Sequence, residues 1–434
     1  MKERILIVDN RGRGHALGWK LKVADGSREL FFAPGNFGTS RLGANVDIDV
    51  TEIDRLERFA SDNQMTLTVV GPEVPLEKGI ANAFREDGLD IFAPTKEAAI
   101  LETSKSEAIR FMQRHNIPHP ESRIFDDINE ALSFVENPTW AEIVVKACGL
   151  AAGKGVILPD SLEEAKQAVK RIMIDKEFDD GKEVVIQKRL RGKEVSLICI
   201  TDGRTIVPLV PVRDYKRLKD GDKGENTGSM GCNSQALLLT PDLLRNIETD
   251  IFNKAISGLR REERAYKGVL YLGGMVIREG GRKRPYVIEF NARWGDPEAQ
   301  AIVPGIVNDF FEVGMAIANG DIRNLQLQTD GKSRVVVAGV SKGYPGNYEA
   351  ARGKQIYGIN EARKVKGVRF YSAAVKEDRG RHYTNGGRLF YIVGEGKDVI
   401  EAQEKAYEAM RFITIEGNNL HFRTDIGWRD VQRL

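Results

Sequence analysis

The chain has few cysteines, and none of them lie close together. Cys148, Cys199 and Cys232 are the only three in 434 residues. An odd number at wide spacing predicts neither a disulfide framework nor a structural zinc site. The histidines are also too scattered for a metal site, because the one pair four residues apart, His115 and His119, has Pro118 between them. We therefore expect a reduced, cytoplasmic protein.

The sequence also lacks a strong excess of charge and any long apolar run. The formal net charge is +2, which provides no basic field of the kind that drives nucleic-acid binding. No window approaches the roughly 18 apolar residues of a membrane span. The first residues, MKERILIVDN, lead directly into a strand-like run, so no signal peptide is expected. These absences argue against a nucleic-acid or membrane partner.

Strand and helix patterns alternate through residues 1–95. Short apolar runs such as ILIV and TLTVV are separated by helix-like segments, which predicts a doubly wound parallel sheet. Ligands of such sheets bind beyond the carboxyl ends of the strands. Here those ends read DNRGRGH, APGNFG, GPE and APTKE. Each alone is typical of a turn, but four together are as consistent with a binding site as with turns.

The rest of the chain predicts mixed α+β structure. Residues 96–116 predict one helix that ends before Pro118, and residues 183–212 predict antiparallel hairpins. Residues 213–236 contain four glycines and mixed charges, which predicts a long functional loop without regular elements. Residues 330–434 predict a separate small α+β unit. A length of 434 residues fits two to four such domains.

A glycine-rich segment, VVKACGLAAGKGVIL, starts at residue 144. It is not a P-loop, because Cys148 stands where the first glycine is needed and Gly155 where a hydroxyl should hold Mg²⁺. Lys146 lies inside its apolar strand. That lysine either meets an anion such as phosphate or protects an edge strand from aggregation.

A second polar segment, YVIEFNARWGDPE, starts at residue 286. Glu289 and Asn291 are two residues apart on a predicted strand and so share a face. Carboxylate and amide oxygens are hard ligands suited to Mg²⁺. Arg293 continues that face and could hold a phosphate or carboxylate. The alternative is a solvated edge strand, but the cluster at the end of an apolar strand favours a site.

These segments together resemble one enzyme family. In order and spacing, VVKACGLAAGKGV, QKRLRGKEVSL, KRLKDGDKGENTGSMG and EFNARWGDPE resemble the ATP-grasp ligases, and most closely the glycinamide ribonucleotide synthetases. The resemblance covers nearly the whole chain. It implies a pre-grasp α/β domain at 1–104, a two-part ATP-grasp domain at 105–328 with a lid at about 118–192, and a C-terminal α+β domain at 329–434.

The resemblance also implies a reaction. ATP, Mg²⁺ (or Mn²⁺), glycine and 5-phosphoribosylamine would give glycinamide ribonucleotide, ADP and phosphate through a glycyl phosphate. Lysines and the metal would neutralise the assembled anions. A mobile glycine-rich cover at 149–155 would exclude water from the acyl phosphate. We expect a monomer or a weak homodimer that acts on these small molecules.

The resemblance assigns roles to residues by position. For ATP it implies Lys105, Lys146, Gly153, Gln187, Lys188, Leu190 and Glu194. For the metal it implies Glu289 and Asn291. For the acyl phosphate and substrate positioning it implies Arg293, Asp296, Asp214 and Lys216. For phosphoribosylamine it implies Gly12, Arg13, His15, Asn36 and Glu73.

The sequence departs from the family pattern at three places. The family usually begins GSGGREHA, whereas positions 9–16 read DNRGRGHA, with Asp9 and Arg11 for glycines and Gly14 for glutamate. Arg11 could replace the missing backbone contacts to the sugar phosphate. Cys148 replaces an aspartate, and the hinge at 187–190 reads QKRL instead of EEFL.

Two other functions stay open at this point. One is an ATP-grasp ligase for a different amine or carboxylate, since the loop at 9–14 is altered. The other is a catalytically silent nucleotide-binding protein, against which the retained lysines and carboxylates argue.

Overall fold

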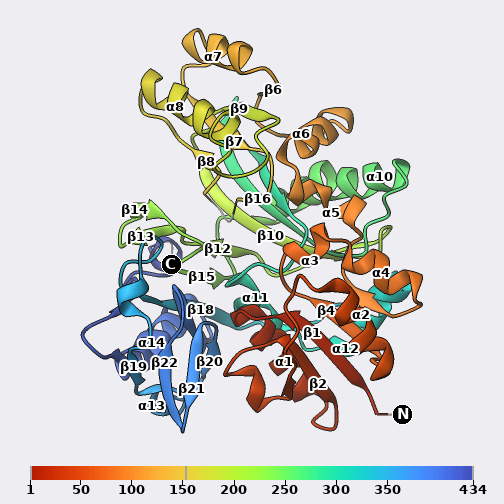
Figure 1. The fold of residues 1–434 in the computed structure, drawn as a ribbon, viewed down its shortest axis with the longest axis vertical. Coiled ribbons are helices and arrows are strands. Elements are labelled where there is room, and N and C mark those ends of the chain that lie inside the picture. Colours follow the sequence, from red (N-terminus) through yellow and green to blue (C-terminus); the bar gives the residue numbers. More distant parts are fainter. Residues whose placement is uncertain (1, 152–153, 433–434) are drawn as a thin grey trace.

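The computed structural model describes residues 2–151 and 154–432 (Figure 1). Its N-terminal strands form one parallel sheet of order β3-β2-β1-β4-β5, as predicted. The core of β1 is buried on both faces, as is usual for a strand covered by helices on each side. The elements of this unit are β1 Arg4–Asp9, α1 Gly12–Ala24, β2 Glu29–Pro34, β3 Ala44–Asn45, α2 Ile53–Asp62, β4 Leu67–Val70, α3 Val74–Glu77, α4 Ile80–Glu86 and β5 Ile91–Phe92.

The single helix predicted for residues 96–116 is wrong, because the chain forms two helices there. α5 spans Lys96–Thr103 and α6 spans Lys105–Arg114. Ser104 between them is extended, with φ −136°, and its hydroxyl accepts a hydrogen bond from the Glu107 N–H at 3.3 Å. A serine that caps one helix competes with continuation of the helix before it. Lys105 consequently begins α6.

A small lobe follows, at the top of Figure 1. Its sheet has the order β6-β9-β7-β8, and α7 and α8 pack together beside it. The lobe has its own apolar core around Val145, Val169 and Ile186. Its elements are β6 Ser122–Phe125, α7 Ile128–Glu136, β7 Ile143–Ala147, β8 Val156–Ile157, α8 Leu162–Met173 and β9 Val184–Lys188.

One long antiparallel sheet runs through the rest of the molecule. Its main path is β17-β16-β10-β12-β15-β18-β23-β20, and β11 and β25 pair at its sides. Its strands are β10 Lys193–Thr201, β11 Ile206–Pro208, β12 Val212–Asp214, β15 Gly231–Ser234, β16 Gly268–Glu279, β17 Arg282–Asn291, β18 Ser333–Ser341, β20 Val368–Ser372, β23 Arg388–Gly396 and β25 Leu420–His421. The pairing of β15 with β18 joins the predicted C-terminal unit to the middle of the chain.

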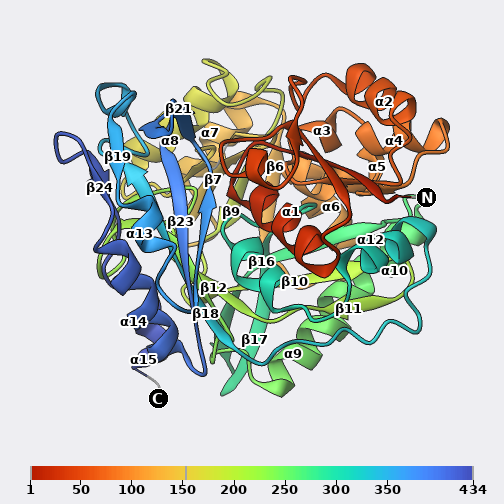
Figure 2. The same ribbon diagram turned by 90° about the horizontal axis from the view of Figure 1, so that it is seen from below.

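Helices and a second C-terminal sheet cover this framework. α14 packs on β18 and β23, and α1 lies against α11 and β20, so the N-terminal and C-terminal units lie side by side (Figure 2). The second sheet has the order β21-β22-β19-β24. These elements are α9 Pro241–Ile247, α10 Asn253–Arg261, α11 Glu298–Ile302, α12 Phe310–Asn319, β19 Gln355–Tyr357, α13 Ile359–Ala362, β21 Val375–Asp378, β22 Arg381–Thr384, α14 Val399–Met410, β24 Thr414–Ile415 and α15 Trp428–Val431.

The prediction of an irregular loop at 213–236 is also wrong. This segment contains the end of β12, all of β15 and a separate two-stranded hairpin, β13 Arg217–Lys219 with β14 Lys223–Asn226. Its strands are only three or four residues long and do not alternate in polarity, so the sequence gives no periodic signal. β15 pairs with β18, about a hundred residues later in the chain.

The described residues, 2–151 and 154–432, contain neither a membrane-spanning helix nor a disulfide. No helix among them is long and apolar enough to cross a membrane. All three cysteines are free thiols, and Cys199 and Cys232 are buried.

Candidate active site

The end of β17 carries the carboxylate and the amide that the sequence singles out. A β-bulge interrupts the pairing with β16, since Gly273 pairs with Glu289 while Gly274 pairs with Val287. Ile288 is therefore the extra residue, and its carbonyl accepts a hydrogen bond from Lys146 Nζ at 3.3 Å. The bulge thus links β17 to the buried lysine of β7.

Three lysines surround Glu289. Lys216 Nζ lies 3.5 Å from its Oε1. Burial raises the pKa of Glu289, but the attraction of Lys216, Lys146 and Lys105 outweighs it and leaves the pKa below its usual value. Burial lowers the pKa of Lys146 to about 8, against the pull of Glu289. The carboxylate of Glu289 raises the pKa of Lys216. The site therefore holds an ionised carboxylate among cations that can meet further anions.

The donor set at β17 fits a magnesium ion. Asn291 is largely buried, and its Oδ1 accepts a hydrogen bond from Arg293 Nη2 at 3.2 Å, which leaves a lone pair for a cation. Within residues 2–151 and 154–432, no three His, Cys, Asp or Glu side chains gather as a metal site. Mg²⁺ accepts one or two protein oxygens and takes its other ligands from phosphates and water.

Arg293 lies between two carboxylates, one of which the sequence did not reveal. Its Nε is 3.1 Å from Glu102 Oε1 and 3.2 Å from Glu73 Oε2. Glu102 Oε2 also accepts the Ala292 N–H at 2.6 Å. Glu102 was missed because a single glutamate on a helix is usually solvated. The one hint of its role in the sequence was Ser104, a helix-capping residue that places Glu102 at the end of a helix.

The buried carboxyl of Glu102 should make the stability of the protein depend on pH. Burial raises its pKa to about 7, partly opposed by Arg293, from 4.5 in the unfolded chain. Between these values the folded state binds more protons, so the free energy of unfolding falls as pH rises. In the Glu102→Gln variant, we expect the fall from pH 5 to pH 7.5 to shrink by about 1–3 kcal/mol in urea unfolding. Equal falls in both proteins would contradict this assignment.

The altered first loop contains a buried ion pair. Asp9 is fully buried, and its Oδ2 lies 2.6 Å from Arg13 Nε, while its Oδ1 accepts the Arg11 N–H. Arg13 also donates to the Trp294 carbonyl at 3.0 Å. A Cβ added at Gly14 would lie 2.6 Å from Asp9 Cβ. Asp9 therefore requires glycine at position 14, and the two departures from the family pattern depend on each other.

Other residues predicted for phosphoribosylamine bind the C-terminal unit. The Nδ1 of His15 accepts the Ser372 N–H at 2.9 Å, and burial lowers the pKa of His15 to about 3. Asn36 Nδ2 donates to the Ser372 carbonyl at 3.2 Å. A Cβ at Gly12 would lie 2.3 Å from the ring of Tyr391. These contacts place the first loop directly against β20 and β23.

Glu73 is the predicted phosphoribosylamine residue that lies nearest Arg293. It is partly exposed, and Arg13 Nη2 lies 3.7 Å from its Oε2. Burial raises its pKa, but Arg293, Arg13 and Arg11 together lower it to about 2. The structure thus brings Arg13, Glu73 and Arg293 into one cluster.

Asp296 lies in a network that includes an arginine from the C-terminal unit. Its Oδ2 is 3.0 Å from Arg388 Nη2 and accepts a hydrogen bond from Tyr391 at 3.1 Å, and its Oδ1 accepts from Gln300 at 2.6 Å. Burial raises the pKa of Asp296, but Arg388, Arg13 and the hydrogen bond from Gln300 together outweigh this and leave the pKa below its usual value. Arg388 was missed because it stands alone at the start of an apolar strand.

Asp214 and Glu194 lie in the electrostatic field of Lys216. Burial and the neighbouring Glu298 raise the pKa of Asp214 to about 7, against Lys216. Glu298 itself accepts a hydrogen bond from Tyr271 at 2.6 Å. Glu194 is exposed on β10, and its charge raises the pKa of Lys216.

Near the predicted ATP site, the side chains of Lys105 and Cys148 each donate a hydrogen bond to a backbone carbonyl. Lys105 Nζ donates to the Gly149 carbonyl at 2.9 Å, so it touches the glycine-rich segment. Cys148 donates to the Glu183 carbonyl at 3.3 Å, and burial raises its pKa to about 11, which describes an unreactive thiol. Gly153 lies outside the described residues.

The predicted hinge is the end of an inner strand. Gln187 is buried and donates to the Ser122 hydroxyl at 2.9 Å, while Lys188 forms an ion pair with Glu121 at 2.7 Å. The Lys188 N–H donates to the Glu121 carbonyl. Leu190 lies just beyond the strand and is half-buried. The side chains of Gln187 and Lys188 are thus engaged within the lobe.

Family models cover most of the chain. Residues 3–102 match the N domain of phosphoribosylglycinamide synthetase, residues 103–299 its ATP-grasp (A) domain, and residues 334–429 its C domain. The chain belongs to the phosphoribosylglycinamide synthetase family. The sequence-based prediction of the family and of its fold class is thereby confirmed, whereas the domain boundaries and the site residues remain predictions.

Individual phosphoribosylglycinamide synthetases are similar over the full chain. The phosphoribosylamine–glycine ligase of Caldanaerobacter subterraneus is 40% identical over 98% of this chain and 99% of its own. The trifunctional purine biosynthetic protein adenosine-3 of Gallus gallus is also 40% identical, but the chain spans only 43% of its length. The crystal structure of phosphoribosylamine–glycine ligase from Thermotoga maritima superimposes with a TM-score of 0.83 and 33% identity, covering 98% of this chain and all of that one.

Proposed function

We propose that this chain ligates glycine to 5-phosphoribosylamine with ATP, giving glycinamide ribonucleotide, ADP and phosphate in purine biosynthesis. The full-length similarity to phosphoribosylamine–glycine ligases supports the reaction. The observation that most supports it is the grouping of Lys216 and Lys146 around Glu289, which lies near the end of β17. This grouping suits a site where phosphates, a carboxylate and Mg²⁺ meet.

The reaction has two balanced steps. A carboxylate oxygen of glycine attacks the γ-phosphorus of ATP, the bond to the bridging oxygen breaks, and ADP leaves. The amine nitrogen of phosphoribosylamine then attacks the acyl carbon of glycyl phosphate, the acyl–oxygen bond breaks, phosphate leaves and the amine loses a proton. Bound Mg²⁺ supplies neutralisation of the phosphate charge. Lysines that meet these anions would stabilise charge without rearranging.

We further propose a role for each group of site residues. Lys105 and Lys146 contact the ATP phosphates, Glu194 the ribose and residues 187–190 the adenine. Glu289 and Asn291 hold the metal, and Lys216 orients the Glu289 carboxylate from 3.5 Å. Arg293 contacts the acyl phosphate from a position fixed by Glu73 and Glu102. We also propose a cytoplasmic protein, which the three free thiols support, and a monomer or weak homodimer.

A phosphate-release assay tests the reaction. Purified protein is mixed with ATP, Mg²⁺, glycine and freshly made phosphoribosylamine, each omitted in turn. We expect release that requires both glycine and phosphoribosylamine. Release only with a different amine would indicate another ATP-grasp ligase, and no release with any amine would indicate a catalytically silent nucleotide-binding protein.

Removing the Arg11 side chain should weaken the binding of phosphoribosylamine more than that of ATP. It is exposed at the start of α1, and its charge lowers the pKa values of Glu73 and Asp296. A guanidinium at this edge of the sheet suits the sugar phosphate. In steady-state kinetics, we expect Arg11→Ala to raise KM about tenfold for phosphoribosylamine and less than about twofold for ATP. Equal changes in both constants would exclude a phosphate contact by Arg11.

A further inference from the structure

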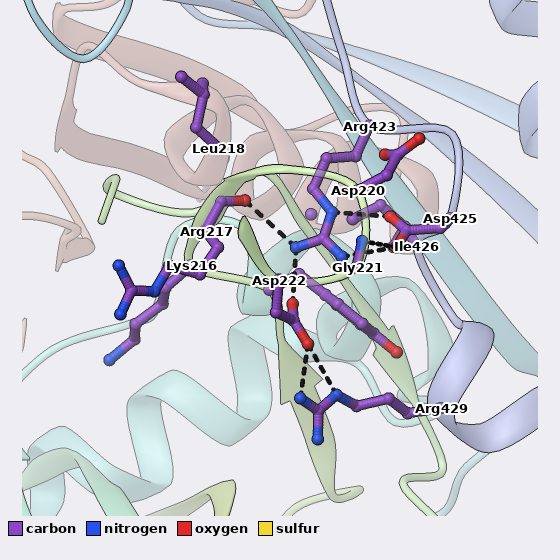
Figure 3. Close-up of polar contacts among 12 residues, drawn as sticks. Lys216, Arg217, Leu218, Asp220, Gly221, Asp222, Arg423, Asp425, Ile426 and Arg429 are labelled. Atoms are coloured by element: carbon purple, nitrogen blue, oxygen red, sulfur yellow. Dashed lines mark hydrogen bonds and ion pairs between the residues drawn. The ribbon is translucent and has the colours of Figure 1, made fainter. Parts of the chain in front are cut away.

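The β13–β14 hairpin is held mainly by residues from the other end of the chain. The two strands form a sheet of their own, and a two-stranded hairpin alone is only marginally stable. Its turn lies against Arg423, Asp425 and Arg429, about 200 residues later in sequence (Figure 3), and also binds Thr424. We call these four residues the C-terminal clasp.

Arg423 is the centre of the clasp. Its side chain is fully buried and lies between Asp222 and Asp425 (Figure 3). Its Nη1 is 2.8 Å from Asp222 Oδ1, and its Nε and Nη2 make two bonds of 2.7 and 2.8 Å to Asp425. A buried guanidinium is stable only when it is paired in this way. The clasp therefore fixes the position of Asp222, which is on the hairpin.

Other contacts hold the same turn. Asp222 Oδ2 also accepts from Arg429 Nε at 2.9 Å. The Gly221 N–H donates to Asp425 at 2.8 Å, and the Thr424 N–H donates to Asp220 at 2.9 Å. Three successive residues of the turn are thus bound by side-chain or backbone groups of one distant segment.

Arg423 also contacts both neighbours of Lys216. Its Nη1 donates to the Arg217 carbonyl at 3.2 Å, and its guanidinium lies over the ring of Tyr215, 5.2 Å from the centroid. The carbonyl of Lys216 itself accepts a hydrogen bond from the Thr227 N–H at 2.8 Å. The Lys216 side chain extends away from the clasp, and its Nζ lies 3.5 Å from Glu289 Oε1.

We propose that the clasp is a positioning element for Lys216: Arg423 and Asp222 fix the hairpin so that the Lys216 ammonium stays beside the Glu289 carboxylate. This inference rests on the proposed function, because it assigns Lys216 a part in the reaction. None of the clasp residues needs to touch a substrate. Their effect passes through the backbone of residues 215–217.

Asp222→Asn tests the positioning role with little change of shape. Asp222 has φ +56°, a conformation that asparagine also tolerates, so the backbone is retained while the charge between Arg423 and Arg429 is lost. We expect kcat to fall about tenfold or more, with the KM values for glycine and phosphoribosylamine within about twofold. Trypsin cleavage after Lys219 and Lys223, both exposed, should become faster.

Glu225→Gln is the matched control. Glu225 is on the same hairpin and is exposed, and its side chain makes no hydrogen bond or ion pair with the part of the chain that the structure describes. It makes the same change of charge without touching the clasp. Its kcat and its rate of tryptic cleavage should equal those of the unmodified protein.

A double-mutant cycle with Lys216→Ala shows whether the clasp acts through that lysine. Single-turnover phosphate release at high enzyme concentration is measured for both single variants and the double variant. We expect Asp222→Asn to have almost no further effect once Lys216 is absent, since residues that act as one unit are not additive. Independent, multiplicative losses would overturn the proposal. So would faster cleavage of the hairpin with unchanged kcat, or no change in either.

A failure of the proposed function can be distinguished from a failure of the clasp proposal by phosphate release from the unmodified protein. In that case the unmodified protein itself releases no phosphate with glycine and phosphoribosylamine. The tryptic comparison between Asp222→Asn and Glu225→Gln still reports whether the clasp holds the hairpin. Equal cleavage in the two variants would then overturn the clasp on its own.

Discussion

Replacing Glu289 by alanine is expected to lower kcat by about 10³-fold or more, because it removes the proposed metal ligand and the counter-charge of Lys216 and Lys146. Lys216 Nζ is 3.5 Å from the carboxylate, and Glu289 opposes the fall of the Lys146 pKa to about 8. Without Glu289, the pKa of Lys146 falls further, so more of it is neutral at pH 7.5. The measurement is phosphate release as a function of Mg²⁺ concentration.

Two variants make this result specific. Glu289→Gln keeps the shape and one oxygen ligand but not the charge, so we expect an intermediate loss of about 10²-fold. Glu279→Ala, at the far end of the same β16–β17 hairpin with its side chain 45% exposed, should keep kcat within about twofold. A Glu289→Ala enzyme with an unchanged rate at limiting Mg²⁺ would show that the metal is held elsewhere.

Replacing Asp9 by alanine is expected to lower the free energy of unfolding by about 3–5 kcal/mol, because Arg13 stays buried without its nearest partner. Arg13 Nε lies 2.6 Å from Asp9, whereas its next carboxylate, Glu73, is 3.7 Å from Nη2. Gly14→Glu alone should also destabilise, since its Cβ would meet Asp9 Cβ at 2.6 Å. Denaturation in urea measures both losses.

The double variant distinguishes a linked exchange from two separate changes. Asp9→Gly with Gly14→Glu restores the pattern that the family usually has at these two positions. With Asp9→Gly measured alone as the matched single variant, we expect the double variant to be more stable than the sum of the Asp9→Gly and Gly14→Glu losses predicts, by at least about 1 kcal/mol. If the two losses simply add, Asp9 and Gly14 are independent and their coupling through space is not significant.

The sequence predicted those parts of the fold that depend on local patterns. The alternation in residues 1–95 predicted the parallel sheet, because buried parallel strands are continuous apolar runs. The two-residue spacing of Glu289 and Asn291 was sufficient to place both at the end of one strand. The resemblance to the family supplied the order of the units.

The errors have a common physical cause. Ser104 ends one helix and caps the next, and the choice between capping and continuing depends on what α5 and α6 pack against. Within 213–236, β15 pairs with β18 about a hundred residues later, and the β13–β14 hairpin is held by the clasp. Glu102 and Arg388 meet Arg293 and Asp296 only in the folded chain. Single-sequence patterns contain no information on such distant contacts.

The shared sheet has a consequence for the order of synthesis. β15 ends at Ser234, and its partner β18 begins at Ser333, about a hundred residues later. At translation rates of roughly 5–20 residues per second, the edge of β15 stays unpaired for about 5–20 s on the ribosome. An open strand edge is a template for pairing with other chains. The middle of this protein is thus most exposed to aggregation while it is being made, before its own C-terminal strands can cover it.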